Sequence, residues 1–414
     1  MSEIKQGYKQ TKVGIIPEDW EIVKLGKLTT VETGKTPLRS NKQFWDNGTI
    51  NWATTTEVNE TYIVSTNEKI TNQAVAELKM KILPINTILL AMYGQGKTRG
   101  KVALLRIEST INQAFASIKP NKNYSTNFIF NYLDKSYEKI RDLSHGSNQD
   151  NLNLDIVKAL QIPLPPLKEQ EKIAEILTTW DKAITKQTEL LRAKELLKIA
   201  LMQKLLSGEV RFDGFSDKWK EVRIDKLFDF KKGQELSKEK LEKNGIFECI
   251  LYGELYTTYS EVISEIKSKT NIKEGIKSKI DDILIPASTT TSAIDLAIAS
   301  TIQKDNVLIG GDINILRKKT NNINGEFISK YLTHIKKMEI AKYAQGITII
   351  HLYSKDFKHL KIKLPSLPEQ QKIAEVLSLA DDEINLLKNE LEELKLQKKA
   401  LMQKLLTGQV RVKV

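Results

Sequence analysis

The heptapeptide Ala200-Leu201-Met202-Gln203-Lys204-Leu205-Leu206 occurs a second time, unchanged, as residues 400–406 of this 414-residue chain. The match extends in both directions at a constant offset of 200. Residues 162–212 align with residues 362–412 without a gap, and 26 of these 51 positions are identical. Self-similarity of this length indicates an internal duplication.

The segments upstream of the two copies match only at a few anchors. Trp20 corresponds to Trp219 and Gly34 to Gly233, at an offset of 199, and the halves diverge between these anchors. This alternation predicts two domains of one fold that are adapted to different targets. The segments are a first variable domain (1–161), a central shared segment (162–218), a second variable domain (219–361) and a C-terminal shared segment (362–414).

Both shared segments carry apolar residues at alternating steps of three and four, which is the seam of a coiled coil. Prolines block a helix upstream of each seam, and Gly208 and Gly408 stand where a C-terminal cap belongs. We expect helices over about 169–206 and 369–406, each about 57 Å long. We predict that the seam residues form a spacer and support partner proteins. They are Ile173, Leu177, Ile184, Leu191, Leu201 and Leu205 in the first helix and Ile373, Leu377, Ile384, Leu391, Leu401 and Leu405 in the second.

The order of the segments constrains the direction of these helices. The first helix leaves variable domain one and leads to domain two, and the second helix leaves domain two. If they pack on each other they are antiparallel, with one globular domain at each end. A generic dimerising coiled coil is the alternative, and the duplication of the whole unit argues against it.

Short apolar runs and longer amphipathic stretches alternate within the variable segments. Residues 87–93, 281–286 and 311–317 predict buried strands, whereas 127–143 and 326–343 predict helices. We therefore predict an α+β fold, with two globular domains separated by two long antiparallel helices.

Composition limits the partners and the compartment. Lys and Arg total 64 against 52 Asp and Glu, and a net charge of +12 favours a polyanionic partner, nucleic acid before a membrane surface. Cys249 is the single cysteine and the four histidines lack metal-ligand spacing, so we expect a cytoplasmic protein without a metal. The N-terminus has no signal-peptide core and no run of 18 apolar residues occurs, so we expect neither secretion nor a membrane span.

The stretch from Tyr93 to Lys101 is the most suggestive loop of domain one. It carries three cations and an aromatic ring on a glycine-rich backbone, which suits contact with phosphates and base edges. It also contains Gly-Lys-Thr, the tail of a nucleotide-binding P-loop, but Ala91 occupies the position of the first required glycine. We predict DNA contact here, with an ordinary solvated turn as the alternative. The candidate residues of this domain are Lys35, Tyr93, Gln95, Lys97, Thr98, Arg99 and Lys101.

The corresponding stretch of domain two, residues 286–293, has no cation but many hydroxyl groups. Hydroxyls can bond phosphates or bases, and a polar surface loop is an almost equal alternative. The candidate residues of this domain are Tyr252, Ser288, Thr289, Thr290 and Thr291.

With these motifs in place, the whole chain resembles the DNA-specificity subunit of type I restriction-modification enzymes. The resemblance rests on residues 14–20, on the Pro- and Glu-Gln-rich runs at 163–173 and 364–373, and on the ends at 201–208 and 401–408. It departs from expectation at 288–292, where hydroxyl residues replace a Gly/Arg-rich turn.

The resemblance implies two target recognition domains that each recognise one half of a split, asymmetric DNA site. It also implies conserved helices that hold these domains apart and bind two methyltransferase subunits, which restriction subunits then join. The complex would use S-adenosylmethionine, ATP and Mg²⁺, with no cofactor bound by this chain.

An enzyme acting alone is the main rival class. A DNA amino-methyltransferase needs an Asn/Asp-Pro-Pro-Tyr/Phe motif, and the context of Pro165-Pro166 does not supply it. Residues 77–79 have the Glu-x-Lys spacing of a metal-dependent nuclease but no Pro-Asp partner nearby. We expect no catalytic activity from this chain, and the second alternative is a protein-interaction scaffold that binds no DNA.

Overall fold

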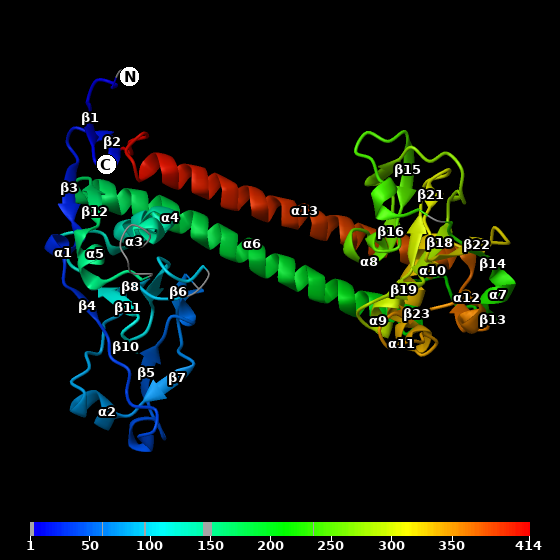
Figure 1. The fold of residues 1–414 in the computed structure, drawn as a ribbon, viewed down its shortest axis with the longest axis horizontal. Coiled ribbons are helices and arrows are strands. Elements are labelled where there is room, and N and C mark those ends of the chain that lie inside the picture. The colour runs from blue at the N-terminus through cyan, green and yellow to red at the C-terminus, as the bar shows by residue number, and fades with distance from the viewer. Residues whose placement is uncertain (1–3, 60, 95–96, 144–150, 235) are drawn as a thin grey trace. The chain divides into compact units, whose positions relative to one another are not determined.

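The computed structural model describes residues 4–59, 61–94, 97–143, 151–234 and 236–414. The chain divides into two compact units, one made of residues 1–188 and 389–414 and the other of residues 189–388. Both divisions fall inside the two long helices, α6 (Leu167–Ser207) and α13 (Leu367–Leu405). Each unit therefore contains one globular domain and one part of each long helix (Figure 1).

The domain of the first unit is built on a five-stranded sheet in the order β4-β11-β8-β9-β6. These strands are β4 (Val31–Thr33), β11 (Phe115–Ile118), β8 (Ile88–Ala91), β9 (Val102–Leu105) and β6 (Tyr62–Ile63). A three-stranded sheet joins β10 (Thr110–Ile111), β5 (Ile50–Ala53) and β7 (Glu68–Ile70), and two pairs join β1 (Tyr8–Thr11) to β2 (Gly14–Pro17) and β3 (Glu21–Lys24) to β12 (Gln161–Leu164). The helices are α1 (Leu25–Leu28), α2 (Asn72–Glu77), α3 (Thr126–Lys135), α4 (Tyr137–Asp142) and α5 (Leu154–Ala159), with short 3-10 turns at Lys42–Phe44 and Glu57–Asn59.

The domain of the second unit repeats this topology. Its five-stranded sheet has the order β14 (Phe228–Lys232), β22 (Ile313–Lys318), β18 (Asp282–Pro286), β20 (Ser300–Ile302) and β16 (Val262–Ile263). The smaller sheets join β17 (Ser268–Thr270), β15 (Phe247–Ile250) and β21 (Leu308–Ile309), β13 (Lys220–Arg223) with β24 (Lys361–Leu364), and β19 (Ser288–Thr289) with β23 (Ile350–His351). The helices are α7 (Ile224–Leu227), α8 (Glu254–Thr257), α9 (Ala293–Leu296), α10 (Gly325–His334), α11 (Lys337–Ala341) and α12 (Ser354–Phe357), with a 3-10 turn at Lys238–Lys240. The prediction of two α+β domains of one fold is confirmed.

The anchors shared by the two halves have structural reasons. Trp20 packs edge-on against Phe128 with ring centroids 6.4 Å apart, and Trp219 packs against Phe327 at 6.1 Å in the same way. A Cβ atom on Gly34 would stand 1.8 Å from a backbone carbonyl oxygen, so no side chain fits there. Gly233 has the same crowding, also at 1.8 Å.

The strand predictions hold because the central strands are buried on both faces over most of their length, which makes their sequences mainly apolar. The helix predictions for 127–143 and 326–343 are wrong in one respect, because each stretch forms two helices. The first breaks at Ser136, after which Tyr137 donates a hydrogen bond to the carbonyl of Lys97. The second breaks at Ile335 and Lys336.

The long helices agree with their predicted bounds to within two residues at each end, and both end at glycines with positive φ, Gly208 at 75° and Gly408 at 70°. Within the first unit they run antiparallel, since Asp181 pairs with Lys398 and Gln187, further along α6, bonds to Glu390, earlier in α13. Within the second unit Lys198 pairs with Asp381 in the same sense. The seam residues near the helix ends, such as Ile173 and Leu405 in the first unit, are buried in the core of the adjoining domain. Among the described residues, no helix combines the length and apolar character that a membrane span needs.

Candidate nucleic-acid interface

In the first unit, the loop between β8 and β9 holds most of the predicted DNA-contacting residues. The hydrogen-bonded pairing of β8 and β9 extends into the base of this loop. Ala91 donates a backbone hydrogen bond to Lys101 and receives one from Gly100. Gly100 has φ of 86°, a conformation that favours glycine. The hydroxyl of Tyr137 donates to the Lys97 carbonyl at 2.7 Å and accepts from Arg141 at 3.0 Å. Helix α4 therefore fixes the returning half of this loop.

The loop presents its side chains unequally to solvent. Lys97 and Tyr93 are exposed, whereas Thr98, Arg99 and Lys101 are half-buried. Lys101 lines a hollow of about 280 Å³ together with Tyr137. Lys97 is thus the most exposed of the three cations of this loop, and Gln95 lies outside the described residues.

Lys35 lies elsewhere in the first unit. Its backbone amide bonds to Ile111, beside the three-stranded sheet, and its exposed ammonium donates to the carbonyl of Leu78 at 2.7 Å. These contacts tie Lys35 to the segment after α2 rather than to the loop after β8.

In the second unit, the connection between β18 and β20 occupies the same place in the sheet but differs in chemistry. Ser288 and Thr289 are buried and form β19, and the Ser288 hydroxyl donates to Asp312 at 3.1 Å. Thr291 donates to Asp295 at 2.5 Å and shares a hydrogen bond with Thr289 at 2.9 Å. Most of these hydroxyls therefore bond within the domain, while Thr290 and Thr291 are exposed.

Tyr252 is linked to this connection by Tyr256, a residue that the sequence analysis did not single out. Tyr252 packs edge-on against Tyr256 at 6.4 Å. Burial raises the pKa of Tyr256, the negative charge that an ionised Tyr252 would carry adds to the rise, and a hydrogen bond with Thr289 opposes it. The structure thus places Tyr252, Tyr256 and the threonines in one cluster.

A second group of exposed side chains lies beside β19 and was missed by the sequence analysis. Strand β23 pairs with β19 and belongs to a tight turn whose tip, Ile347, is 99% exposed. His351 stacks on Tyr353 with ring centroids 5.6 Å apart, and the ammonium of Lys355 lies 5.4 Å from the centre of the Tyr353 ring. A search for cation-rich loops passes over this turn, whose signal in the sequence is Gly346 followed by isoleucines, with His351 and Tyr353 nearby.

Ion pairs at the starts of the long helices were also not foreseen. Glu169 in α6 is buried and accepts hydrogen bonds from Arg411 at 2.7 and 2.8 Å. Arg411 also binds Asp19 and, through that hydrogen bond, lowers the pKa of its carboxyl group. In the second unit, Glu369 in α13 is held by Arg211 at 2.8 and 2.7 Å. These pairs recur at equivalent positions of the two units.

No three His, Cys, Asp or Glu side chains in the described ranges come together as metal ligands would. The candidate residues of the two domains offer hydrogen-bonding groups, lysine side chains and aromatic rings, which are means by which proteins contact nucleic acids.

Both halves of the chain are similar to known proteins of one family. The family model described as the type I restriction modification DNA specificity domain matches residues 17–193 and again residues 216–396. The putative type I restriction enzyme MjaX specificity subunit of Methanocaldococcus jannaschii is 26% identical over 435 residues, which cover 99% of this chain and 98% of that protein. The MjaIX specificity subunit of the same organism is 36% identical over 202 residues, covering 46% of each.

The fold also matches solved structures along nearly its full length. A crystal structure of the S subunit of a type I restriction-modification system from M. genitalium has a TM-score of 0.58 with 19% identity, covering 93% of this chain and 96% of that one. A chain from a study of complex assembly and conformational transition of the type I restriction-modification system also has a TM-score of 0.58, with 18% identity and coverages of 95% and 99%.

Proposed function

Since the chain belongs to the type I restriction-modification DNA specificity family, we propose that it is the non-catalytic subunit that selects the DNA site for such a complex. One observation carries this proposal. The two domains share one strand order, yet they place different side chains at the same connection, cationic after β8 and hydroxyl-rich after β18. A common scaffold with divergent loops suits the recognition of two different base sequences.

The proposed site is bipartite and asymmetric. Each domain would contact one half-sequence, through the loop after β8 in the first unit and through the threonines, Tyr252 and the neighbouring turn in the second. The helices α6 and α13 each begin in one unit and end in the other. We propose that they set the gap between the half-sequences.

Partner docking is proposed for the outward surface of the long helices. The predicted seam residues near the helix ends are buried in the domain cores, so they support partners only indirectly. By contrast Leu196 in α6 is 60% exposed and Leu396 in α13 is 65% exposed. These leucines occupy equivalent positions of the repeat, so two equivalent docking positions would serve two copies of one methyltransferase subunit.

The complex would supply the chemistry that this chain does not. Methyltransferase subunits would bind S-adenosylmethionine and handle the target adenine, and restriction subunits would use ATP and Mg²⁺. We propose that the complex works in the cytoplasm, where a prokaryotic genome is accessible.

Salt-dependent DNA binding by the reconstituted methyltransferase complex tests the proposal against the scaffold alternative. We expect the affinity to fall steeply with salt, because each neutralised phosphate contributes about −0.9 to the slope of log K against log salt. A matched complex that contains a chain with the connection after β8 replaced by glycine and serine should lose preference for one half-site. Equal affinity of the complex with and without this chain would favour the scaffold.

A further inference from the structure

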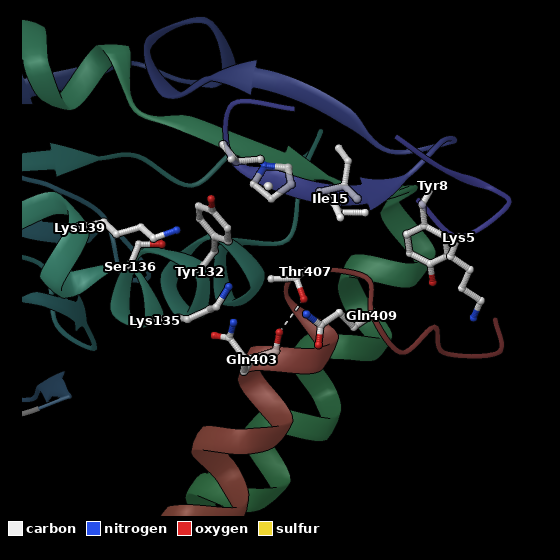
Figure 2. Close-up of a pocket in the computed structure, with 14 residues that line it drawn as sticks. Lys5, Tyr8, Ile15, Tyr132, Lys135, Ser136, Lys139, Gln403, Thr407 and Gln409 are labelled. Carbon is white, nitrogen blue, oxygen red and sulfur yellow. Dashed lines mark hydrogen bonds between the residues drawn. The ribbon is translucent and has the colours of Figure 1, made fainter. Parts of the chain in front are cut away.

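A hollow of about 510 Å³ lies in the first unit, and none of its lining residues belongs to the loop that follows β8. Its walls come from three parts of the chain that are distant in sequence, namely the β1–β2 hairpin, the α3–α4 junction and the end of α13. Figure 2 shows Lys139, Ser136 and Tyr132 at one end of this hollow, and Lys5 with Tyr8 at the other. A volume of this size is in the range of small-molecule sites.

Three lysine side chains line the hollow. Lys5, Lys135 and Lys139 line it, and no carboxylate among the described residues forms an ion pair with any of the three. Lys135 is half-buried, and its ammonium lies 5.7 Å from the centre of the Tyr132 ring. Burial, together with the charge of Lys139, lowers the pKa of Lys135 to about 8. A cation held away from water without a carboxylate is unfavourable unless a ligand compensates it.

The second unit shows that the fold does not require this arrangement. His334 ends α10 as Lys135 ends α3, and it is paired with Glu261 at 2.6 Å. Glu339 is the equivalent of Lys139, because each directly precedes a buried isoleucine, Ile340 or Ile140. Glu339 forms an ion pair with Lys336 at 2.5 Å. The second unit thus has a histidine beside a glutamate, and a glutamate paired with a lysine, where the first unit has Lys135 and Lys139.

We propose that the hollow in the first unit is a binding site for a phosphate-bearing anion, held by the ammonium groups of Lys135 and Lys139. Ammonium groups bind phosphate oxygens as mobile point charges with three donors each. Ser136 and Gln403 line the same hollow and can add neutral hydrogen bonds. The phosphate belongs either to a free nucleotide or to the DNA backbone, and both sources share this chemistry.

The test measures binding of tripolyphosphate, ATP and a non-cognate DNA duplex to the full-length chain by calorimetry. The variants are Lys135→Gln and Lys139→Gln, with Lys336→Gln as the matched control, since Lys336 lies at the same junction of the second unit. Each of the first two variants should weaken tripolyphosphate binding about 10-fold or more, as expected for a lost hydrogen bond to a charged group. The control variant should bind like the parent.

The three probes separate the sources of phosphate. If ATP competes with tripolyphosphate and the duplex does not, the site serves a free nucleotide. If the duplex competes and both variants weaken duplex binding, the site holds the DNA backbone. Absence of tripolyphosphate binding, or an equal loss in Lys336→Gln, overturns the proposal. This outcome would leave the proposed DNA-site selection untouched, because no residue of the candidate recognition loops lines the hollow.

Discussion

Glu169 is buried, with 2% of its side-chain surface exposed, and its carboxylate forms an ion pair with Arg411. Besides two hydrogen bonds from Arg411, it accepts one from the indole of Trp20 at 3.2 Å. Replacing Arg411 with Met would leave a buried carboxylate with the indole as its remaining side-chain donor. We expect Arg411→Met to lower the free energy of unfolding by about 1–3 kcal/mol, measured by urea denaturation.

Two further variants control this prediction. Arg211→Met removes the equivalent partner of Glu369 and should destabilise the second unit in the same direction. Lys361→Met removes an exposed ion pair with Glu221 and should change little. An unchanged unfolding midpoint for Arg411→Met would show that the buried pair does not hold the helix start to the domain.

The cations of the loop after β8 are predicted to contact DNA. Losing a phosphate contact should flatten the salt slope by roughly 0.9, whereas losing a bidentate base contact should cost ~1–3 kcal/mol and relax one position of the site. We expect Lys97→Ala to give the largest effect, because Lys97 is exposed while Arg99 and Lys101 are half-buried. The measurement is the affinity of the methyltransferase complex for cognate and half-mutated duplexes across salt concentrations. If Lys97→Ala, Arg99→Ala and Lys101→Ala all bind DNA like the parent at every salt concentration, this loop is not part of the DNA interface.

Sequence patterns revealed the cationic loop but not the partners of its residues. The glycines and cations of residues 93–101 are visible in the chain itself. The contact of Tyr137 with Lys97 joins residues 40 positions apart, and that of Arg411 with Glu169 joins residues 242 positions apart. Such contacts depend on tertiary packing, which local composition does not encode. Ser288 and Thr289 likewise look like loop residues until their pairing with β23 is known.

At the scale of elements, the exposed leucines of the long helices provide the test of partner docking. An aspartate at Leu196 or Leu396 would place a charge in a proposed apolar interface. We expect each single variant to bind one methyltransferase subunit instead of two, and the double variant to bind none, as measured by mass photometry.

Leu386→Asp is the matched control for docking. Leu386 is 59% exposed, but the equivalent position of the repeat is Lys186, so this position cannot be shared by two identical partners. The variant should keep both methyltransferase subunits. Loss of both subunits in every one of these variants, the control included, would point to a damaged helix pair rather than to docking sites.

The length of α13 is expected to set the gap between the two half-sequences. Deleting one heptad, residues 384–390, shortens the proposed spacer by about 10 Å. We expect the gap between the half-sequences to change, or activity to be lost, while the bases of each half-sequence stay the same. Sequencing of methylated DNA from a strain with the shortened helix measures both. Altered half-sequence bases with an unchanged gap would contradict the spacer role.

Among the elements, those with a strong repeating pattern were predictable from the sequence. The long helices follow from a seam of apolar residues with glycine caps, and the central strands follow from burial on both faces. The break between α3 and α4 was not predictable, because no proline or glycine interrupts residues 127–143. Ser136 and Tyr137 continue a helical pattern in the sequence, and the hydrogen bond of Tyr137 to the loop after β8 immediately follows the break.

At the scale of the whole molecule, duplication explains both the similarity and the difference of the two units. The same sheet order, the same tryptophan–phenylalanine contact and the same buried glutamate–arginine pair occur in both. The connections after β8 and β18 do not match, and neither do the charges at the α3–α4 and α10–α11 junctions. The contacts shared by the two units maintain the common fold. The connections and junctions that differ can therefore determine what each unit binds.

Sequencing of the methylated bases in genomic DNA from a strain that expresses the complete complex tests the central claim most directly. Two different recognition domains predict a modified site of two unlike half-sequences separated by unspecified bases, about one helical turn of DNA apart, roughly 34–36 Å. Exchanging residues 219–361 for the corresponding domain of a related specificity subunit should change one half-sequence and leave the other unchanged. A single continuous palindrome, or a change in both half-sequences, would contradict the account.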